Sequence, residues 1–270
     1  MITLTDIHKK FNADTQNEVY ALQGINLNIR QGEFVTIIGT NGSGKSTLLN
    51  LLAGAIAPDT GSVFINDRDV TRQKDYQRAR VIARVFQNPF MGTAPDMTIA
   101  ENLLIASLRG LKHHLRVGLS ARRLAEFRKQ VARLEMQLED RLDNIIGSLS
   151  GGQRQAVSLL MAVIRKPDVL LLDEHTAALD PKSAAQIVAL TKTFVEKENL
   201  TTFMVTHSMQ QALELGNRTL MMHKGQIIDD ISEKEKKQLT VDDLLDKFAQ
   251  LRKAEKLTDE IIQQLRKEYR

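Results

Sequence analysis

The stretch of sequence that decides the fold is Gly39-Thr40-Asn41-Gly42-Ser43-Gly44-Lys45-Ser46-Thr47. It fits the phosphate-binding loop pattern G-x-x-x-x-G-K-[ST], in which the two outer glycines, the lysine and the serine occupy fixed places. A short apolar and β-branched run at 34–38 precedes it, and residues 46–52 have the character of a buried helix. The sequence therefore predicts a strand, a glycine loop and a helix in that order.

This arrangement favours the binding of a phosphate group. Glycines let backbone N–H groups turn toward phosphate oxygens, and the N-terminus of the following helix adds partial positive charge. We expect Lys45 to reach the β- and γ-phosphates of a nucleotide and the Ser46 hydroxyl to bind Mg²⁺. A chance match to the pattern is the alternative, and the expected strand and helix on either side argue against it. We therefore assign residues 39–47 to nucleotide binding.

A second candidate site ends a continuous apolar run at 169–172, which is followed by Asp173 and Glu174. Such a run is expected of a parallel strand buried on both faces, and α/β folds bind ligands at the carboxyl ends of their strands. We expect Asp173 to hold Mg²⁺ through its water shell and Glu174 to polarise an attacking water. An Asp-Glu pair after a strand is weak evidence alone, but downstream of a phosphate-binding loop it becomes strong.

Composition limits the class of protein. The chain has 270 residues, of which 42% are hydrophobic and 26% are charged, with a net charge of +4 and a pI near 9.2. These values fit a globular protein that handles nucleotides or lies near anionic lipid, and they do not require a nucleic-acid partner. Because there are no cysteines, disulfides, thiolate zinc sites and iron–sulfur clusters are excluded. The N-terminus lacks a basic and apolar leader, and no apolar stretch is long enough to span a bilayer, so we expect a cytoplasmic chain.

The rest of the chain is organised around these two sites. Residues 1–38 alternate apolar and polar side chains and predict β structure. From about 90 to 148 the pattern turns helical and charged, which indicates a helical insertion with helices at 99–108 and 121–138. The α/β pattern then resumes. It predicts a helix at 151–166, a helix at 181–198, a strand at 201–206 and a hairpin that turns at Lys224-Gly225.

We divide the chain into one domain over 1–232 and a charged helical tail over 233–270. Thr240 and Asp243 resemble a capping box that opens a helix, and a second short helix is expected after Thr258. The apolar face of the first helix consists of Leu244, Leu245, Phe248 and Leu251. Packing on the domain edge is one interpretation of this tail, and dimerisation or partner docking is the other.

A third motif, Leu149-Ser150-Gly151-Gly152-Gln153, lies before the strand at 169–173 and opens a predicted helix. Here the chain resembles the ABC ATPases, whose signature has this sequence. Further matches follow the family's order over about the first 230 residues. These are Phe11 for the aromatic residue that stacks on adenine, Gln87 for the Q-loop, Asp180 for the D-loop and His207 for the switch histidine.

The resemblance implies an α/β fold with a RecA-like P-loop NTPase core, an antiparallel β subdomain and an inserted helical subdomain. It implies hydrolysis of ATP with Mg²⁺, in which Glu174 is the general base or water-polarising residue. His207 would contact the γ-phosphate, and Gln87 would sense Mg²⁺ and the partner. By resemblance, Ser150, Gly151, Gly152 and Gln153 close over ATP bound by a second copy, with Asp180 at the same junction.

Several of these residues have a structural alternative. Phe11 fits an ordinary strand-end core position, Gln87 a strand-terminal polar position, and His207 alone would more often be structural. His175 departs from the family, where proline commonly follows the glutamate, and it leaves Glu174 intact. The remaining histidines have no partners at metal-ligand spacing, and we assign them no role.

Family resemblance indicates the ATP-binding subunit of a membrane transporter. We expect separate permease subunits whose helices dock beside Gln87 and 88–97, and a peripheral position on the cytoplasmic face of the membrane. The run at 173–181 and the tail at 240–270 resemble bacterial uptake ATPases paired with branched-chain-type permeases and solute-binding proteins, which predicts uptake of a small solute such as an amino acid.

Two alternatives remain at this point. A non-transport ABC ATPase acting on nucleic acid or ribosomes usually carries a long coiled-coil insertion, a cysteine cluster or two cassettes, and this sequence has none of them. A P-loop kinase or GTPase is disfavoured by the motif at 149–153 and by the lack of an Asn-Lys-x-Asp sequence. We therefore expect no nucleic-acid partner.

Overall fold

The computed structural model describes residues 1–111 and 118–254, with side chains described up to residue 249. The strands are β1 (Ile2–Phe11), β2 (Val19–Ile29), β3 (Phe34–Gly39), β4 (Thr60–Ile65), β5 (Arg68–Asp69), β6 (Ile82–Val85), β7 (Val169–Asp173), β8 (Thr201–Val205), β9 (Arg218–His223) and β10 (Gln226–Ser232). The helices are α1 (Lys45–Ala53), α2 (Asp75–Arg78), η1 (Pro89–Gly92), α3 (Ile99–Leu108), α4 (Ala121–Ala132), η2 (Ile146–Ser148), α5 (Gly151–Val163), α6 (Pro181–Glu198), α7 (Met209–Glu214), α8 (Glu233–Lys236) and α9 (Val241–Ala254).

The core is a six-stranded sheet in the order β10-β9-β3-β8-β7-β6, parallel except for β10. Every residue of β3 and β8 is buried, as the apolar runs predict. In the register of the sheet, Val205 of β8 lies beside both Ile37 of β3 and Asp173 of β7. The carboxyl ends of these three strands therefore meet at one edge, where the predicted phosphate loop and carboxylates lie.

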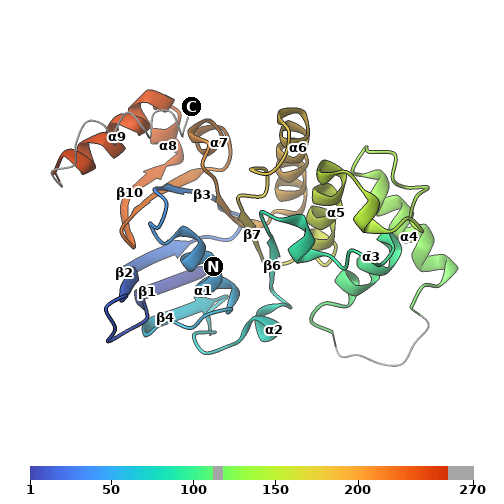
Figure 1. The fold of residues 1–270 in the computed structure, drawn as a ribbon, viewed down its shortest axis with the longest axis horizontal. Coiled ribbons are helices and arrows are strands. Elements are labelled where there is room, and N and C mark those ends of the chain that lie inside the picture. Colours follow the sequence, from blue (N-terminus) through green and yellow to red (C-terminus); the bar gives the residue numbers. More distant parts are fainter. Residues whose placement is uncertain (112–117, 255–270) are drawn as a thin grey trace.

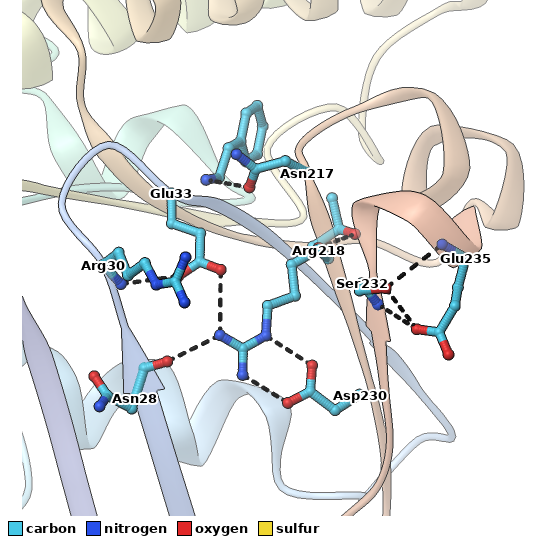
Figure 2. A network of polar contacts seen from close by, with 10 residues as sticks. Asn28, Arg30, Glu33, Asn217, Arg218, Asp230, Ser232 and Glu235 are labelled. Atoms are coloured by element: carbon cyan, nitrogen blue, oxygen red, sulfur yellow. Dashed lines mark hydrogen bonds and ion pairs between the residues drawn. The ribbon is translucent and has the colours of Figure 1, made fainter. Parts of the chain in front are cut away.

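A smaller antiparallel sheet, in the order β2-β1-β4-β5, carries the N-terminal segment. Polar contacts of one arginine tie it to the core sheet (Figure 2). Arg218 donates hydrogen bonds to the carbonyl of Asn28 at 2.9 Å, to Glu33 at 3.2 Å and to both carboxylate oxygens of Asp230 at 2.6 and 2.7 Å. These contacts join β2, β9 and β10, at the end of β3 opposite the phosphate loop.

The inserted helices form a lobe at one end of the molecule, and the tail lies at the other (Figure 1). Thr98 and Glu101 make a reciprocal capping box at the start of α3. The predicted helix at 121–138 is wrong in its extent, because α4 ends at Ala132 and Glu135 and Gln137 take left-handed φ values of 54° and 56°. The apolar spacing predicted too long a helix because Leu134 and Leu138 are fully buried, although both lie beyond its end.

The tail begins where β10 ends. Thr240 and Asp243 cap α9 as predicted, and Leu244, Leu245 and Phe248 pack with Met209 and Ala212 of α7 in one apolar cluster. The side chain of Leu251 and the second helix expected after Thr258 lie outside the described residues. The boundary between 232 and 233 stays a prediction. Among the described residues, no helix combines the length and apolar character needed to cross a bilayer.

Candidate active site

The phosphate-binding loop connects β3 to α1 and needs its glycines for close packing. A Cβ at Gly39 would lie 2.2 Å from the carbonyl oxygen of Met222, and one at Gly44 would lie 2.4 Å from that of Ala21. Gly44 also has a φ of 99°, which L side chains rarely adopt. The N-cap of α1 is Gly44, which has no side chain to accept from the first N–H groups of the helix. The loop therefore fits a phosphate group that would accept these bonds.

Lys45 is folded into this loop and is 5% exposed. Its ammonium donates to the carbonyls of Gly39 at 2.6 Å and Thr40 at 3.1 Å. Burial lowers the pKa of Lys45, and the charges of Glu174 and Asp173 act against that shift. Beside it, the buried Ser43 hydroxyl has no hydrogen-bond partner among the described residues. A positive group and an unsatisfied hydroxyl inside the same loop match the chemistry of a phosphate.

The hairpin between β9 and β10 supports the loop from behind, a role that sequence spacing did not indicate. Gly225 donates its N–H to the Ser43 carbonyl at 3.0 Å, and its own carbonyl accepts from Gln23 at 2.8 Å. Thr40 and His223 lie 3.4 Å apart between Oγ1 and Nδ1. The turn predicted at Lys224-Gly225 thus holds the phosphate loop against the antiparallel sheet.

Glu174 and His207 form the predicted pair next to the loop. The Nε2 atom of His207 lies 2.6 Å from Oε1 of Glu174, and both side chains are partly buried. Glu174 takes a left-handed φ of 47°, and its N–H donates to the carbonyl of Val205 at 3.1 Å. The hydrogen bond from His207, with help from the charge of Lys45, lowers the pKa of Glu174. The carboxylate is therefore ionised near neutral pH and can accept a hydrogen bond from water.

Asp173 is held by a residue that sequence analysis missed. Arg84 of β6 donates through Nη2 to Asp173 at 2.6 Å and through Nη1 to Asn50 of α1 at 2.5 Å. The arginine lies between the buried residues Ala83 and Val85 of β6, and that position alone did not separate it from a solvent-facing charge. Its guanidinium ties the ends of β6 and β7 to the helix that follows the phosphate loop.

Two predicted residues lie at the margins of the site. Gln87 follows the end of β6 by two residues and precedes η1, so it stands between the sheet edge and the helical lobe. Phe11 ends β1 with an exposed side chain, and the ammonium of Lys9 lies 5.8 Å from its ring centre. Tyr20 on β2 is a second exposed aromatic residue. It pairs with Lys10 of β1, whose ammonium lies 4.2 Å from the centre of its ring.

The signature residues lie on the helical lobe. Ser150 caps α5, accepting from the N–H of Gln153 at 3.3 Å, and the Gln153 side chain accepts from the N–H of Ser150 at 3.2 Å. Ser150 and Gly151 are exposed, as is Asp180, which caps α6. Figure 1 shows α5 and α1 in different parts of the molecule. Within one chain, the structure thus brings together the phosphate loop, the carboxylates and His207, and places the signature motif elsewhere, with Ser150 and Gly151 exposed and Gly152 buried.

A phosphate loop after β3, two carboxylates at the end of β7 and a histidine after β8 define a P-loop nucleoside triphosphatase. Residues 22–177 match the family model described as ABC transporter, and the chain belongs to this family. Both the fold class and the family expected from the sequence are therefore confirmed.

Known relatives agree. The chain is 40% identical over 248 residues to the tyrosine transport ATP-binding protein of Clostridioides difficile (strain R20291), a match that covers 92% of this chain and 98% of the relative. It is 38% identical to the spermidine/putrescine import ATP-binding protein PotA of Hahella chejuensis over 84% of this chain and 57% of the relative. A solved dimeric ATP-binding cassette bound to ADP and Pi gives a TM-score of 0.74 at 29% identity, covering 86% of this chain and 99% of that chain. The chain is thus an ABC ATPase, which binds and hydrolyses ATP.

Proposed function

We propose that the chain is the ATP-hydrolysing subunit of an uptake transporter and works as a dimer bound to membrane permease subunits. The observation that carries this proposal is the match to an amino-acid transport ATP-binding protein along 98% of its length, together with the Glu174–His207 pair beside the phosphate loop. An amino acid is the transported class that this relative favours. The chain would sit peripherally on the cytoplasmic face of the membrane.

The phosphate loop would bind the nucleotide through its own groups. Lys45 and the first N–H groups of α1 would hold the β- and γ-phosphates, with Thr40, Asn41, Gly42 and Thr47 completing the cradle. Ser46 and Asp173 would hold Mg²⁺, with Gln87 as a further oxygen ligand. The metal ion, when bound, neutralises charge that develops on the transferred phosphoryl group. Phe11 would stack on adenine, a contact worth about 1–3 kcal/mol by analogy with base stacking on aromatic side chains.

Glu174 would act on the attacking water. A carboxylate whose pKa is lowered by its histidine neighbour is a weak base, so it is better suited to accept a hydrogen bond and orient water than to remove a proton at the outset. His207, 2.6 Å away, would fix the carboxylate and contact the γ-phosphate. The pair thereby supplies orientation, which contributes much of the rate in phosphoryl transfer.

A second copy would complete the site. Ser150 and Gly151 are exposed at the start of α5, where the serine hydroxyl and the helix N-terminus suit the γ-phosphate of ATP held by the other subunit, with Gly152 and Gln153 behind them in the same turn. Asp180 is exposed at the start of α6 and would lie at the same junction. The dimeric form of the similar cassette supports this arrangement.

We place the permease contact in a groove between β6, η1, α3 and α5, which we call the docking groove. It has a volume of about 350 Å³ and a mainly apolar lining that includes Pro89, Ile105 and Met161. Among the described residues that line it, Arg84 and Arg109 are charged and none is a carboxylate. A permease helix with apolar side chains and one acidic side chain would fit this lining.

Co-purification tests the proposed function. The tagged chain is recovered from native membranes in mild detergent, and we expect a multi-span membrane protein in near-equal amount. Ile105→Lys should abolish its recovery, whereas Ile145→Lys should not, because Ile145 is equally exposed, at 51% against 50%, and does not line the groove. Recovery of only soluble proteins, ribosomes or nucleic acid would support a non-transport ATPase instead. Equal recovery with both variants would remove the docking groove from the proposal.

A further inference from the structure

Arg154 is a buried cation near the start of α5 that none of the site assignments uses. Its side chain is 5% exposed. Burial lowers its pKa, and no described carboxylate opposes that shift. A charged side chain buried in this way is costly unless its hydrogen bonds are satisfied. The partners of its guanidinium therefore indicate what it stabilises.

Those partners are backbone carbonyls that directly precede the signature serine. Nε donates to the carbonyl of Ile146 at 3.2 Å, and Nη2 donates to those of Gly147 at 2.7 Å and Leu149 at 2.9 Å. The next residue is Ser150, which caps α5. One guanidinium thus sets the path of the chain into the signature motif.

The same guanidinium lies over the ring of Phe90, a residue that flanks the docking groove. Its Cζ atom is 3.7 Å from the ring centre of Phe90, close enough for a cation–π contact. Phe90 belongs to η1, between the groove-lining residues Pro89 and Gly92, and is 49% exposed. About half of the residue is therefore accessible to a partner, while the guanidinium lies close to the ring centre.

Other contacts between these segments do not depend on the ring. Gln155 donates to the carbonyl of Phe86 at 3.2 Å, and Gly147 donates its N–H to the carbonyl of Pro95 at 2.9 Å. These bonds keep the two backbones together. Arg154 differs from them because it contacts both the half-exposed side chain of Phe90 in η1 and the backbone carbonyls that precede Ser150.

We propose that Arg154 is a positioning residue that couples the docking groove, through Phe90, to the placement of Ser150 in the ATP-bound dimer. This proposal rests on the proposed function. A partner that moves the Phe90 ring would change the plane and the solvation of the guanidinium, and with them the orientation of the three carbonyls. The γ-phosphate of the other subunit would then meet a displaced Ser150. Arg154 itself touches no nucleotide.

The test measures ATP-driven dimerisation in a Glu174→Gln parent, in which slow hydrolysis preserves the ATP-bound state. Phe90→Ala, Arg154→Lys and the double variant are compared by sedimentation with ATP, and ATP affinity of the dilute monomer is measured separately. We expect Phe90→Ala to weaken dimerisation about tenfold and to add nothing in the Arg154→Lys background. Monomer ATP affinity should stay within about twofold, because the Lys45 loop is unchanged.

Tyr76→Ala is the matched control, since it also truncates an exposed aromatic residue. Tyr76 belongs to α2, which is part of neither the phosphate loop nor the signature motif. It should leave dimerisation unchanged. Phe90→Ala keeps the test valid even if Arg154→Lys folds poorly, since half of the ring is already exposed. The coupling would be overturned if the parent dimerises and Phe90→Ala dimerises equally well. It would also be overturned if the effects of the two substitutions on dimerisation add in the double variant. A parent that never dimerises with ATP would overturn the proposed function along with it.

Discussion

Replacing Arg78 by methionine should destabilise the helix that carries the phosphate loop. Arg78 is 1% exposed, and its guanidinium donates to the carbonyls of Leu51 and Leu52 at 2.7 Å each and also to that of Val70. The two leucines lie in the last turn of α1, whose first residue is Lys45. Methionine retains much of the apolar volume and removes every donor. The substitution therefore isolates the polar contribution.

The size of the effect follows from these contacts. The carbonyls of Leu51 and Val70 keep backbone donors, so the largest cost falls on Leu52, and an unsatisfied buried acceptor costs about 1–3 kcal/mol. Three further bonds are lost: those to Leu51 and Val70, each worth about 1.5–3 kcal/mol, and a longer, weaker one to the carbonyl of Thr71 at 3.4 Å. Removing a desolvated cation, whose burial lowers the pKa of Arg78 to about 10, offsets part of this sum. We expect a net loss of about 3 kcal/mol, or about 6–12 °C in Tm.

Thermal and urea unfolding of the nucleotide-free protein measure this loss, and ATP affinity should fall with it. Arg72→Met is the matched control, because Arg72 is exposed on the same stretch and should change stability by less than about 0.5 kcal/mol. An Arg78→Met protein that unfolds with the wild-type midpoint would refute the reasoning, since it would mean that water or relaxation satisfies the α1 carbonyls at no cost.

The remaining predictions concern the two residues after Asp173. Glu174→Gln should lower ATP turnover by about 10²–10⁴-fold while ATP still binds, as phosphate-release and nucleotide-binding assays will show; near-normal hydrolysis would remove Glu174 from the mechanism. His175 is buried against Thr191 at 3.0 Å, and burial lowers its pKa to about 4. Below about pH 6.5 the unfolded chain takes up a proton that the folded chain refuses until about pH 4, so stability falls on acidification. Between pH 7 and pH 4 the wild type should lose about 3 kcal/mol more than His175→Gln in urea unfolding, and parallel pH profiles would contradict this account.

The parts of the site that sequence predicted are those in which chemistry needs residues at fixed local spacing. Gly39, Gly44 and Lys45 must stand at a fixed spacing, because a phosphate-binding loop surrounds the phosphate with a single turn of backbone. Asp173 could be placed because parallel strands end at a common edge of the sheet. His207 was located by family resemblance, and its contact with Glu174 depends on β7 and β8 being neighbours, which their order in the sequence does not specify.

What sequence could not predict are the contacts of Arg78, Arg84 and Arg154. Arg78 and Arg154 are buried and Arg84 is partly buried. Each looks like an ordinary surface charge in sequence, because the order of residues does not show which acceptors the fold brings to it; Asp173, for example, lies 89 positions from Arg84. The same limit explains the overlong helix at 121–138. Apolar spacing records which residues are buried, and Leu134 and Leu138 are buried, but two left-handed residues end the helix before them.

Two arginines, Arg78 and Arg109, contact the C-terminal ends of the two helices whose N-termini carry the proposed phosphate-binding motifs. Neither α1 nor α5 has a basic residue in its last turn. Each instead receives a guanidinium from elsewhere in the chain: Arg78 on the carbonyls of Leu51 and Leu52, and Arg109 on the carbonyl of Ala162 at 2.9 Å. Burial lowers the pKa of both arginines to about 10, so both stay charged at neutral pH. A cation at the C-terminal end of a helix is stabilised by the helix dipole and satisfies carbonyls that have no intrahelical donor. The C-terminal ends of both helices are thereby fixed to the rest of the fold, while the positive N-terminal ends remain available for the phosphate contacts that we propose.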